Sequence, residues 1–575
     1  MKLSFRYFAL VVMGAMICGC AEEVEDLQPS VGGTVTMKTT VSLSENASTR
    51  ALTEAGVKTF TAGDQIAVVY EQASGTAKAL SVALTDDDIT NSGKDAAFTV
   101  TLSSPKANGK VRYIYPASMV ADDVSTTTPD DNTTIKWTNL AAQDGTLVSL
   151  ANNLDLGVFD GSLTSEAILP NTATLANKLT ICKFTLKDFA GTSTLDALTS
   201  ATITDGTYTY TVTPASPATV LTWPIYVAMK SVTDDKTITV TATTNATIVD
   251  GATLSYKKQV TGNALAAGNI YPVNVKMNRL VNMTGATNNV YALHGDILTG
   301  TLNPYYVEIP DGATVTLRDV SIISSQNGVY CDANATIILE GSNVITSSHK
   351  AGILGWYKYD STNPGPVPTL EIKGSGSLTV SGGTEGGAGI GSCEFFNPCG
   401  NILISDGTII ATGGTGAAGI GSGMNSNYRN DCYCGNITIT GGNVTAIAGG
   451  GGNSNYNISA GIGCGYRNSC GAITISGGTV HAKTTFNGVG AIGKNDFEES
   501  TCPSVTITND ISSVAMTNTF NRTINYLSYH IYATTIQIGG VSVITKTVLD
   551  GTQTFGSVKA TFDSSTNTLT ATPNS

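Results

Sequence analysis

The chain has 575 residues, of which 13% are charged, and its net charge at pH 7 is −13. An acidic surface repels phosphate, which argues against nucleic acid as a partner. Thr, Ser, Asn and Gly are abundant, and this composition is typical of extracellular β proteins built from strands and tight turns. The length allows three or more domains, each with its own core.

The first 20 residues predict a signal peptide and lipid attachment. Two basic residues precede the apolar run Tyr7–Ile17, which is too short to span a bilayer as a helix. The segment Ile17–Cys20 resembles the lipobox of bacterial lipoproteins, and this implies that Cys20 becomes the lipidated N terminus. The acidic stretch 21–26 is similar to tags that carry lipoproteins to the outer leaflet of the outer membrane. We expect an outer-membrane lipoprotein at the cell surface; ordinary secretory cleavage near Gly19 is the alternative.

Residues 21–50 are predicted to be an acidic linker and pro-segment, which contains a candidate first strand at Gly33–Leu43. Short alternating strands follow, up to about residue 278, without a fixed period. Clusters of Gly, Pro, Asn and Asp separate them, as in β-sandwiches. We therefore predict two tandem β-sandwiches, residues 51–165 and 166–279.

This half contains four short signatures: Phe60-x-x-Gly63-Asp64-x-Ile66-x-Val68, Tyr113-Ile114-Tyr115-Pro116, Trp223-Pro224-Ile225-Tyr226-Val227-Ala228 and Ala267-Gly268-Asn269-Ile270-Tyr271. In their residues and their order they resemble the fimbrillin-like family, the lipoprotein pilus subunits of gut and oral Bacteroidetes. The residues themselves are ordinary core residues of strands that follow turns. The resemblance covers roughly the first half of the chain and implies a pilus-associated, fimbrial protein.

In fimbrillins, an arginine-specific protease removes the N-terminal strand, and a neighbour's strand takes its place. Ser48-Thr49-Arg50-Ala51 looks like that processing site, which implies cleavage between Arg50 and Ala51 and donor-strand exchange with other pilus subunits. The alternative is an exposed linker arginine without a role. A shaft subunit of this family ends near its second sandwich, whereas a long second half follows here. This arrangement suits the end of a pilus, or a surface protein that stands alone.

One unit recurs seven times in the second half. Each unit has an alternating strand, a glycine turn, a second short strand and a corner similar to Ala-Gly-Ile-Gly. The alternating pairs are Val315/Leu317, Ile337/Leu339, Leu370/Ile372, Ile402/Ile404, Ile437/Ile439, Ile473/Ile475 and Val505/Ile507. Alternation sends every second side chain inward, and stacked coils then bury continuous apolar ladders. We predict a right-handed parallel β-helix over residues 280–535, closed by a β cap over 536–575, and thus an all-β fold.

Most of the extra residues in the longer coils fall after the corner, so the inserted loops are expected to gather on one face. This face carries aromatic, Arg and Asn side chains that could stack on sugar rings and bond to hydroxyls. The predicted ligand-binding residues are Trp356, Tyr357, Phe395, Phe396, Tyr428, Arg429, Tyr466 and Arg467. We predict an adhesin that binds a glycan or a host surface ligand. The alternative is that these rings only pack the loops against each other.

Eight of the eleven cysteines lie in the predicted β-helix. Four directly precede an inward strand and are expected to stack as a ladder: Cys399, Cys434, Cys470 and Cys502. Loop bridges Cys393–Cys399 and Cys464–Cys470, or a bridge between coils from Cys399 to Cys434, are all open. The four histidines are widely separated and no Cys-x-x-Cys pair occurs, so no metal or cofactor is expected.

Parallel β-helices also host polysaccharide lyases and glycosidases, so a polysaccharide-degrading enzyme anchored at the outer membrane is the alternative function. Glycoside hydrolysis needs two carboxylates about 5 to 9.5 Å apart. The candidates Glu394, Asp406, Asp431, Glu498 and Glu499 form no repeated pair. The basic residues that a lyase would need are limited to Arg429, Arg467, His481 and Lys483. We therefore predict adhesion without catalysis.

Overall fold

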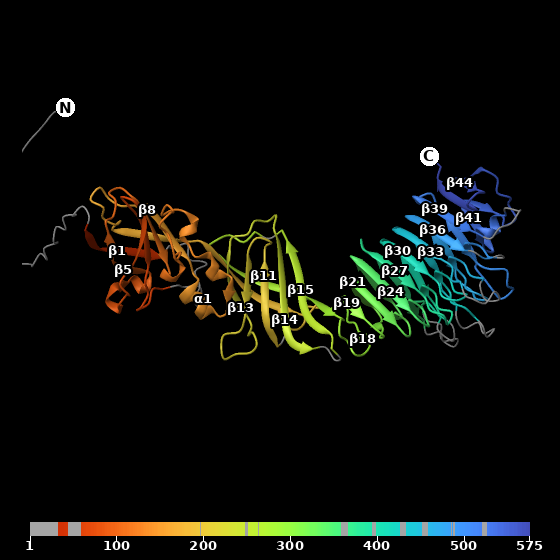
Figure 1. The fold of residues 1–575 in the computed structure, drawn as a ribbon, viewed down its shortest axis with the longest axis horizontal. Helices are drawn as coiled ribbons and strands as arrows, with labels where there is room; N and C mark the ends of the chain where they lie inside the picture. Colours follow the sequence, from red (N-terminus) through yellow and green to blue (C-terminus); the bar gives the residue numbers. More distant parts are fainter. Residues whose placement is uncertain are drawn as a thin grey trace, which may run out of the picture. The chain divides into compact units, whose positions relative to one another are not determined.

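A computed structural model describes residues 33–43, 59–195, 197–247, 251–262, 264–357, 366–393, 398–425, 433–450, 458–484, 486, 489–519 and 526–574. The predicted all-β fold is confirmed, and the α-helix α1 (Leu147–Asn153) is short. The chain divides into two compact units (Figure 1). The first comprises Met1–Asn139, Val148–Thr180 and Ala267–Asn269; the second comprises Leu140–Leu147, Ile181–Ala266 and Ile270–Ser575.

The first unit contains an eight-stranded sheet with the order β3-β2-β6-β8-β9-β1-β5-β4. Its strands are β1 (Thr34–Leu43), β2 (Ala67–Gln72), β3 (Gly75–Leu80), β4 (Ile89–Thr90), β5 (Asp95–Ser103), β6 (Lys110–Tyr115), β8 (Gly157–Ser162) and β9 (Thr172–Asn177). Strands from both ends of this sheet contribute side chains to one apolar core. In this core the ring of Phe60 packs edge to face against the rings of Phe98 and Tyr115. Phe60 and Tyr115, each from one of the short signatures of this part, are therefore core residues.

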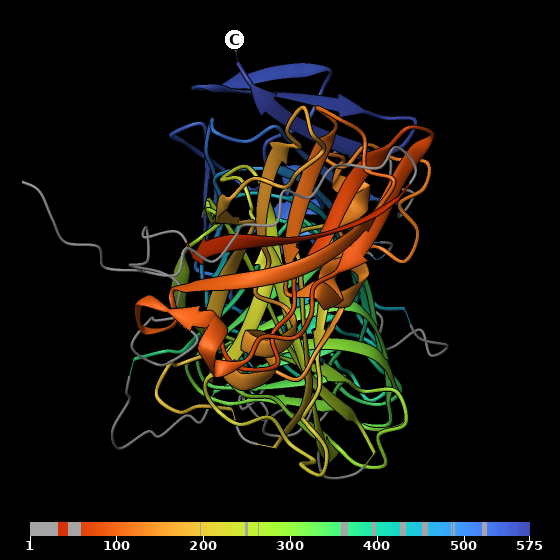
Figure 2. The ribbon, with the colours of Figure 1, turned by 90° about the vertical axis from the view of Figure 1, so that its left-hand side faces the viewer.

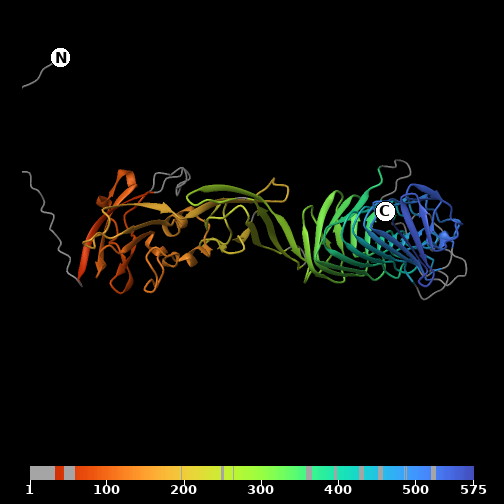
Figure 3. The same cartoon turned by 90° about the horizontal axis from the view of Figure 1, so that it is seen from above.

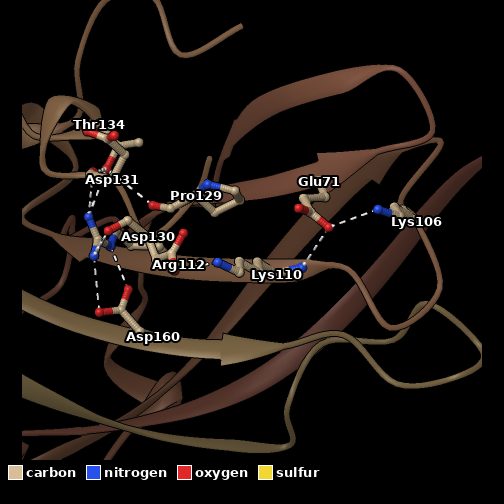
Figure 4. A network of polar contacts seen from close by, with 9 residues as sticks. All are labelled: Glu71, Lys106, Lys110, Arg112, Pro129, Asp130, Asp131, Thr134 and Asp160. Carbon is tan, nitrogen blue, oxygen red and sulfur yellow. Dashed lines mark hydrogen bonds and ion pairs between the residues drawn. The ribbon is translucent and has the colours of Figure 1, made fainter. Parts of the chain in front are cut away.

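Arg112 on β6 is buried and fixes a loop of the first unit (Figure 4). Its Nε and Nη2 donate to the two carboxylate oxygens of Asp160 at 2.6 and 3.1 Å. Nη1 donates to the carbonyl of Asp131 at 2.7 Å and to Oγ1 of Thr134 at 3.1 Å, and Nη2 also donates to the carbonyl of Asp130 at 2.8 Å. A planar guanidinium can serve all these acceptors at once, whereas an ammonium cannot.

Replacing Arg112 by Met is expected to destabilise the protein by about 2 kcal/mol, because two loop carbonyls and Thr134 lose their donor. Urea denaturation of the full chain would measure the effect. Lys110→Met is the matched control, because its ion pair with Asp130 is solvent-exposed on both sides and should contribute little. Equal midpoints for the two variants would show that Arg112 does not hold the loop.

The second unit begins with two sheets. One has the order β13-β10-β16, and the other runs through β7, β12, β11, β14, β15 and β17. The strands are β7 (Ala142–Gln143), β10 (Leu179–Lys187), β11 (Leu198–Thr204), β12 (Thr209–Val212), β13 (Ile225–Lys230), β14 (Thr237–Thr247), β15 (Thr253–Thr261), β16 (Ile270–Lys276) and β17 (Asn278–Asn282). Strand β17 pairs antiparallel with β15 and parallel with the first strand of the solenoid, so the sheet continues into the repeats.

The repeats form a three-sided parallel solenoid, whose coils stack in chain order from green to blue in Figure 3. The first side contains β19 (Ile297–Leu302), β21 (Ala313–Ser324), β23 (Ala335–Glu340), β26 (Thr369–Lys373), β29 (Asn401–Ile404), β32 (Ile437–Ile439), β35 (Ile473–Ile475), β38 (Ser504–Ile507) and β41 (Thr535–Ile538). The second contains the end of β21, then β24 (Ser342–Ser347), β27 (Ser377–Ser381), β30 (Thr408–Thr412), β33 (Asn443–Ile447), β36 (Thr479–Thr484) and β39 (Ser513–Asn518).

The third side is formed by the segments that the sequence suggests as corners. It contains β18 (Val290–Tyr291), β20 (Val307–Ile309), β22 (Val329–Asp332), β25 (Ile353–Trp356), β28 (Ile390–Gly391), β31 (Ile420–Gly421), β34 (Ile462–Gly463), β37 (Ile492–Gly493) and β40 (Ile531–Tyr532). All these strands pair in parallel with the equivalent strand of the next coil.

The apolar pairs stack in register along the first side, as in Ile402↔Ile437 and Ile404↔Ile439. One register differs from an alignment of the first residue of each pair with the first residue of the next. Ile337 lies opposite Ile372, and Leu370 lies opposite Ala335. A shift of two residues keeps the same side chains inside, because the period of a strand is two. The ladder continues through Ile536 and Ile538 of β41, and the antiparallel cap begins after it.

Cysteines line part of the solenoid core. Cys399, Cys434 and Cys470 follow one another on adjacent coils as a parallel ladder, and all are buried. The Sγ atoms of Cys464 and Cys470 lie 3.1 Å apart. Burial raises the pKa of the Cys331 thiol in the same core, so this thiol stays protonated at neutral pH.

The cap consists of β42 (Val541–Val543), β43 (Thr552–Phe555), β44 (Val558–Asp563) and β45 (Thr568–Pro573), drawn in dark blue in Figure 2. Strand β45 pairs antiparallel with both β44 and β39. Leu569 and Ala571 of β45 are buried in the solenoid core. The C-terminal strand thus covers backbone groups that an open coil would expose.

His530 makes the stability of this end pH-dependent. Its ring is fully buried, and Nδ1 donates to the carbonyl of Met516 at 3.0 Å, while Nε2 has no hydrogen-bond partner among the described residues. Burial lowers its pKa to about 4.

Because the folded pKa of His530 lies below the usual value near 6.5, the unfolded chain binds more protons between these values. Stability should therefore fall as the pH drops from about 6.5 to 4, with a contribution from His530 on the order of 3 kcal/mol. Urea unfolding at pH 7 and pH 4, compared between wild type and His530→Gln, would measure it. The same pH dependence in both proteins would contradict this assignment.

Candidate functional site

Strand β1 lies inside the sheet of the first unit, with a partner on each edge. It pairs antiparallel with β5 from Thr34↔Ser103 to Ser42↔Asp95. On its other edge it pairs parallel with β9 from Thr40↔Thr172 to Leu43↔Leu175. Removal of β1 would leave the facing edges of both neighbours unpaired. We call the place that it fills the β1 position.

Alternate side chains of β1 enter the core, as the period of a strand requires. Met37, Thr39, Val41 and Leu43 are all buried. The hydroxyl of Thr39 donates to the carbonyl of Pro170 at 2.6 Å, and that hydroxyl also accepts a bond from Tyr113. The strand thus supplies three apolar side chains and one satisfied polar group, and its outward face is exposed at Thr34, Thr36, Lys38 and Thr40.

The predicted processing residues Arg50 and Ala51 lie outside the described residues, as does Cys20. Arg50 and Ala51 follow β1 in the sequence, and Cys20 precedes it. The structure therefore bears on this prediction through the placement of β1. The described strand, Thr34–Leu43, ends before Arg50. Cleavage after Arg50 would therefore leave β1 whole and held by contacts alone.

Of the predicted ligand face, Trp356 is the last residue of β25 and Tyr357 directly follows it. The Trp356 ring lies at a 34° tilt over that of Tyr330, with 5.9 Å between centroids, and is partly exposed. Tyr357 is buried, with 7% of its surface exposed, and meets Tyr433 edge to face. Sequence reasoning did not single out Tyr330, although the alternation in β22 already directs it outward beside the next coil.

Tyr466 and Arg467 form a packed group with Phe497. The rings of Tyr466 and Phe497 meet edge to face at 4.9 Å. The guanidinium carbon of Arg467 lies 5.3 Å from the first ring centroid and 4.9 Å from the second, which is a cation–π arrangement. Tyr466 is only 7% exposed. Phe395, Phe396, Tyr428 and Arg429 lie outside the described residues.

The ionisable candidates are dispersed. Asp406 accepts a bond from its neighbour, the Gly407 amide, at 2.8 Å, and His481 contacts Thr517 Oγ1 through Nε2 at 2.9 Å. Glu394 and Asp431 are not among the described residues. Within the described ranges, no three His, Cys, Asp or Glu side chains are grouped as metal ligands. In the same ranges, no helix is long and apolar enough to cross a membrane.

Comparison with known proteins gives distant likenesses. No family model matches the chain, and no curated protein matches it. A fimbrial assembly protein from Parabacteroides distasonis is similar over 43% of this chain and 96% of its own, at 12% identity and a TM-score of 0.24. A protein from Bacteroides uniformis assigned to cell adhesion is similar over 43% and 98%, at 14% identity and a TM-score of 0.24.

The major pilin T-13 from Streptococcus pyogenes is similar over 43% of this chain and 98% of its own, at 11% identity and a TM-score of 0.14. These solved structures are fimbrial, pilin and cell-adhesion proteins.

Proposed function

We propose that this chain is a pilus-associated lipoprotein of the cell surface that accepts a strand from another subunit and displays a ligand-binding solenoid. The observation that carries the proposal is the β1 position. Strand β1 is paired on both edges and buries alternate side chains, and Arg50 follows it within a few residues. Export would begin with the signal peptide of residues 1–20 and lipid attachment at Cys20.

Strand exchange follows from the physics of the β1 position. A strand cut from its chain after Arg50 can dissociate, and the edges of β5 and β9 then need another strand to satisfy their backbone groups. An incoming strand with apolar residues at alternate positions can bury them where Met37, Val41 and Leu43 lie now. The partner that fits is another pilus subunit with such a strand.

The solenoid favours a place at the end of a pilus. It continues the sheet beyond β17, and strand β45 closes it by pairing with β44 and β39 and burying Leu569 and Ala571. Strand β45 is therefore committed to the cap. A chain with such a folded second half suits a pilus tip or a surface protein that stands alone.

The solenoid would then bind a glycan or host ligand, with Trp356, Tyr357, Phe395, Phe396, Tyr428, Arg429, Tyr466 and Arg467 as the proposed residues. The partly exposed Trp356 supports this proposal most directly, because a tryptophan face can stack on a sugar ring. The burial of Tyr357 and Tyr466 gives these two side chains a packing role as well. We propose that the solenoid acts by binding and not by catalysis.

The test compares cells that make the wild-type chain with cells that make Arg50→Gln. The wild-type protein should reach the surface as a chain that begins at Ala51, without the lipidated segment 20–50. It should migrate, unboiled, in high-mass complexes with other subunits. The variant should keep its N-terminal segment and stay out of those complexes. Arg318→Gln is the control for loss of an arginine elsewhere, because both partners of its ion pair with Glu340 are partly exposed. Complexes that form equally with Arg50→Gln would overturn the assembly role.

A further inference from the structure

The outer face of the first coils carries a group of side chains that shares Trp356 with the predicted loop face and otherwise lies outside it. The strands of the third side bring Tyr291, Glu308 and Tyr330 to equivalent positions on successive coils, because Tyr291 pairs with Glu308 and Glu308 with Tyr330. Their neighbours inside each strand point into the core, as the burial of Val290, Val307 and Val329 shows. The three therefore form one outward column.

Three further side chains join this column. Tyr306 lies two residues before Glu308 and Asp332 two residues after Tyr330, so both share the outward face of their strands. Trp356 is the strand partner of Asp332 and its ring lies over Tyr330. We call the six side chains the acidic–aromatic strip: Tyr291, Tyr306, Glu308, Tyr330, Asp332 and Trp356.

The polar groups of the strip have unused hydrogen-bonding capacity. Among the described residues, no hydrogen-bond or ion-pair partner is found for the side chains of Glu308 and Asp332. Tyr291 is 62% exposed, and the other five side chains are partly exposed. Two carboxylates that are not committed to the fold, next to aromatic faces open to solvent, can accept hydrogen bonds from a ligand.

The electrostatic character of the strip is negative. Burial raises the pKa of Glu308, and the nearby carboxylate of Asp332 raises it further. The pKa of Tyr330 is raised mainly by burial and then by its neighbours Asp332, Glu308 and Tyr306. No basic group among the described residues contributes to either shift. An anionic ligand would therefore meet repulsion here, whereas a hydroxyl-rich neutral ligand would meet acceptors.

We propose that the acidic–aromatic strip is a binding site for a neutral polysaccharide. The tyrosine and tryptophan rings stack on the apolar faces of sugar rings, and Glu308 and Asp332 accept bonds from the sugar hydroxyls. The column follows the stacking direction of the coils, so successive sugars of one chain meet successive coils. Acidic polysaccharides are rejected by the same two carboxylates. This inference rests on the proposed glycan-binding role and specifies its ligand class.

The experiment measures binding of the full chain to dextran, mannan, xylan and galactan as neutral probes, and to polygalacturonate as the acidic probe, by affinity electrophoresis. Tyr291→Ala and Glu308→Gln are the test variants. Tyr291 is well exposed, and Gln keeps the shape of Glu308, so both variants should fold. Tyr208→Ala is the matched control, because Tyr208 is an exposed tyrosine of the same unit away from the strip. Circular dichroism would verify the fold of each.

The wild type should bind at least one neutral probe and not polygalacturonate. Each test variant should bind that probe roughly tenfold more weakly, and Tyr208→Ala should bind as the wild type does. The double variant Glu308→Lys/Asp332→Lys should gain binding to polygalacturonate.

Two outcomes would contradict the proposal that the strip binds a polysaccharide, each in a different way. Neutral binding that is unchanged by Tyr291→Ala and Glu308→Gln would exclude the strip and leave glycan binding to the loop face. If the wild-type chain binds none of the neutral probes, both the proposed role of the strip and the proposed glycan-binding function are wrong.

Discussion

A chain that begins at Ala51, and so lacks β1, is expected to lose the folded state of the first unit and to regain it when a peptide with the sequence of residues 34–43 is added. Burial of Met37, Val41 and Leu43 is lost, at about 1.5–3 kcal/mol for each side chain, or roughly 5–9 kcal/mol together. The whole stability of a domain is typically about 5–15 kcal/mol. The unpaired edges of β5 and β9 add to the loss.

Fluorescence of Trp137, which lies in the first unit, would follow the unfolding in urea with and without the peptide in a Trp223→Phe/Trp356→Phe background. A control peptide with Met37, Val41 and Leu43 replaced by Ser should not restore the fold, because it cannot fill the core. A stable first unit without any peptide would show that β1 is dispensable, and the strand-exchange account would then fail.

Gly421→Ala is expected to destabilise the solenoid by about 3 kcal/mol or more, which is exceptional for the addition of one methyl group. Gly421 adopts φ +139°, and a Cβ at this position would fall on the carbonyl oxygen of Gly463 in the next coil. The same glycine recurs on four consecutive coils: Gly391, Gly421, Gly463 and Gly493. Relief of the clash would require the coils to separate where Ser422 N–H donates to the Gly463 carbonyl.

The control is Gly312→Ala in the first coils. Gly312 also has a positive φ of +74°, but a Cβ there would meet nothing within 4 Å, so only backbone strain of about 1–2 kcal/mol remains. Fluorescence of Trp356 in a Trp137→Phe/Trp223→Phe background would report unfolding of the solenoid alone. If both glycine variants lose the same stability, the close approach between coils is not the cause.

The repeats could be predicted from the sequence because one physical rule governs them. The alternation of pairs such as Ile437/Ile439 gives the inward face directly, and the structure stacks them in register. The third side was harder to predict, because strands of two residues such as Ile420–Gly421 are too short to show a period. They resemble corners until their pairing partners on adjacent coils are known.

The position of β1 and the acidic–aromatic strip could not be predicted for a different reason. The sequence indicates a strand at Gly33–Leu43, but its insertion between β5 and β9 depends on pairing with segments far along the chain. Likewise Tyr291, Glu308 and Tyr330 are about twenty residues apart in sequence, and their spacing differs from coil to coil. Only the register of the coils places them together.

If the protein assembles by strand exchange, the β1 position must open first. The most direct test is the double variant Thr36→Cys/Thr101→Cys, which joins β1 to β5 by a disulfide; the two exposed threonines are strand partners with hydroxyls 2.9 Å apart, and facing partners in antiparallel strands suit a disulfide. After cleavage at Arg50, the oxidised variant should retain β1 and stay out of subunit complexes, and reduction should restore assembly. Assembly of the oxidised, locked protein at the wild-type level would contradict the account.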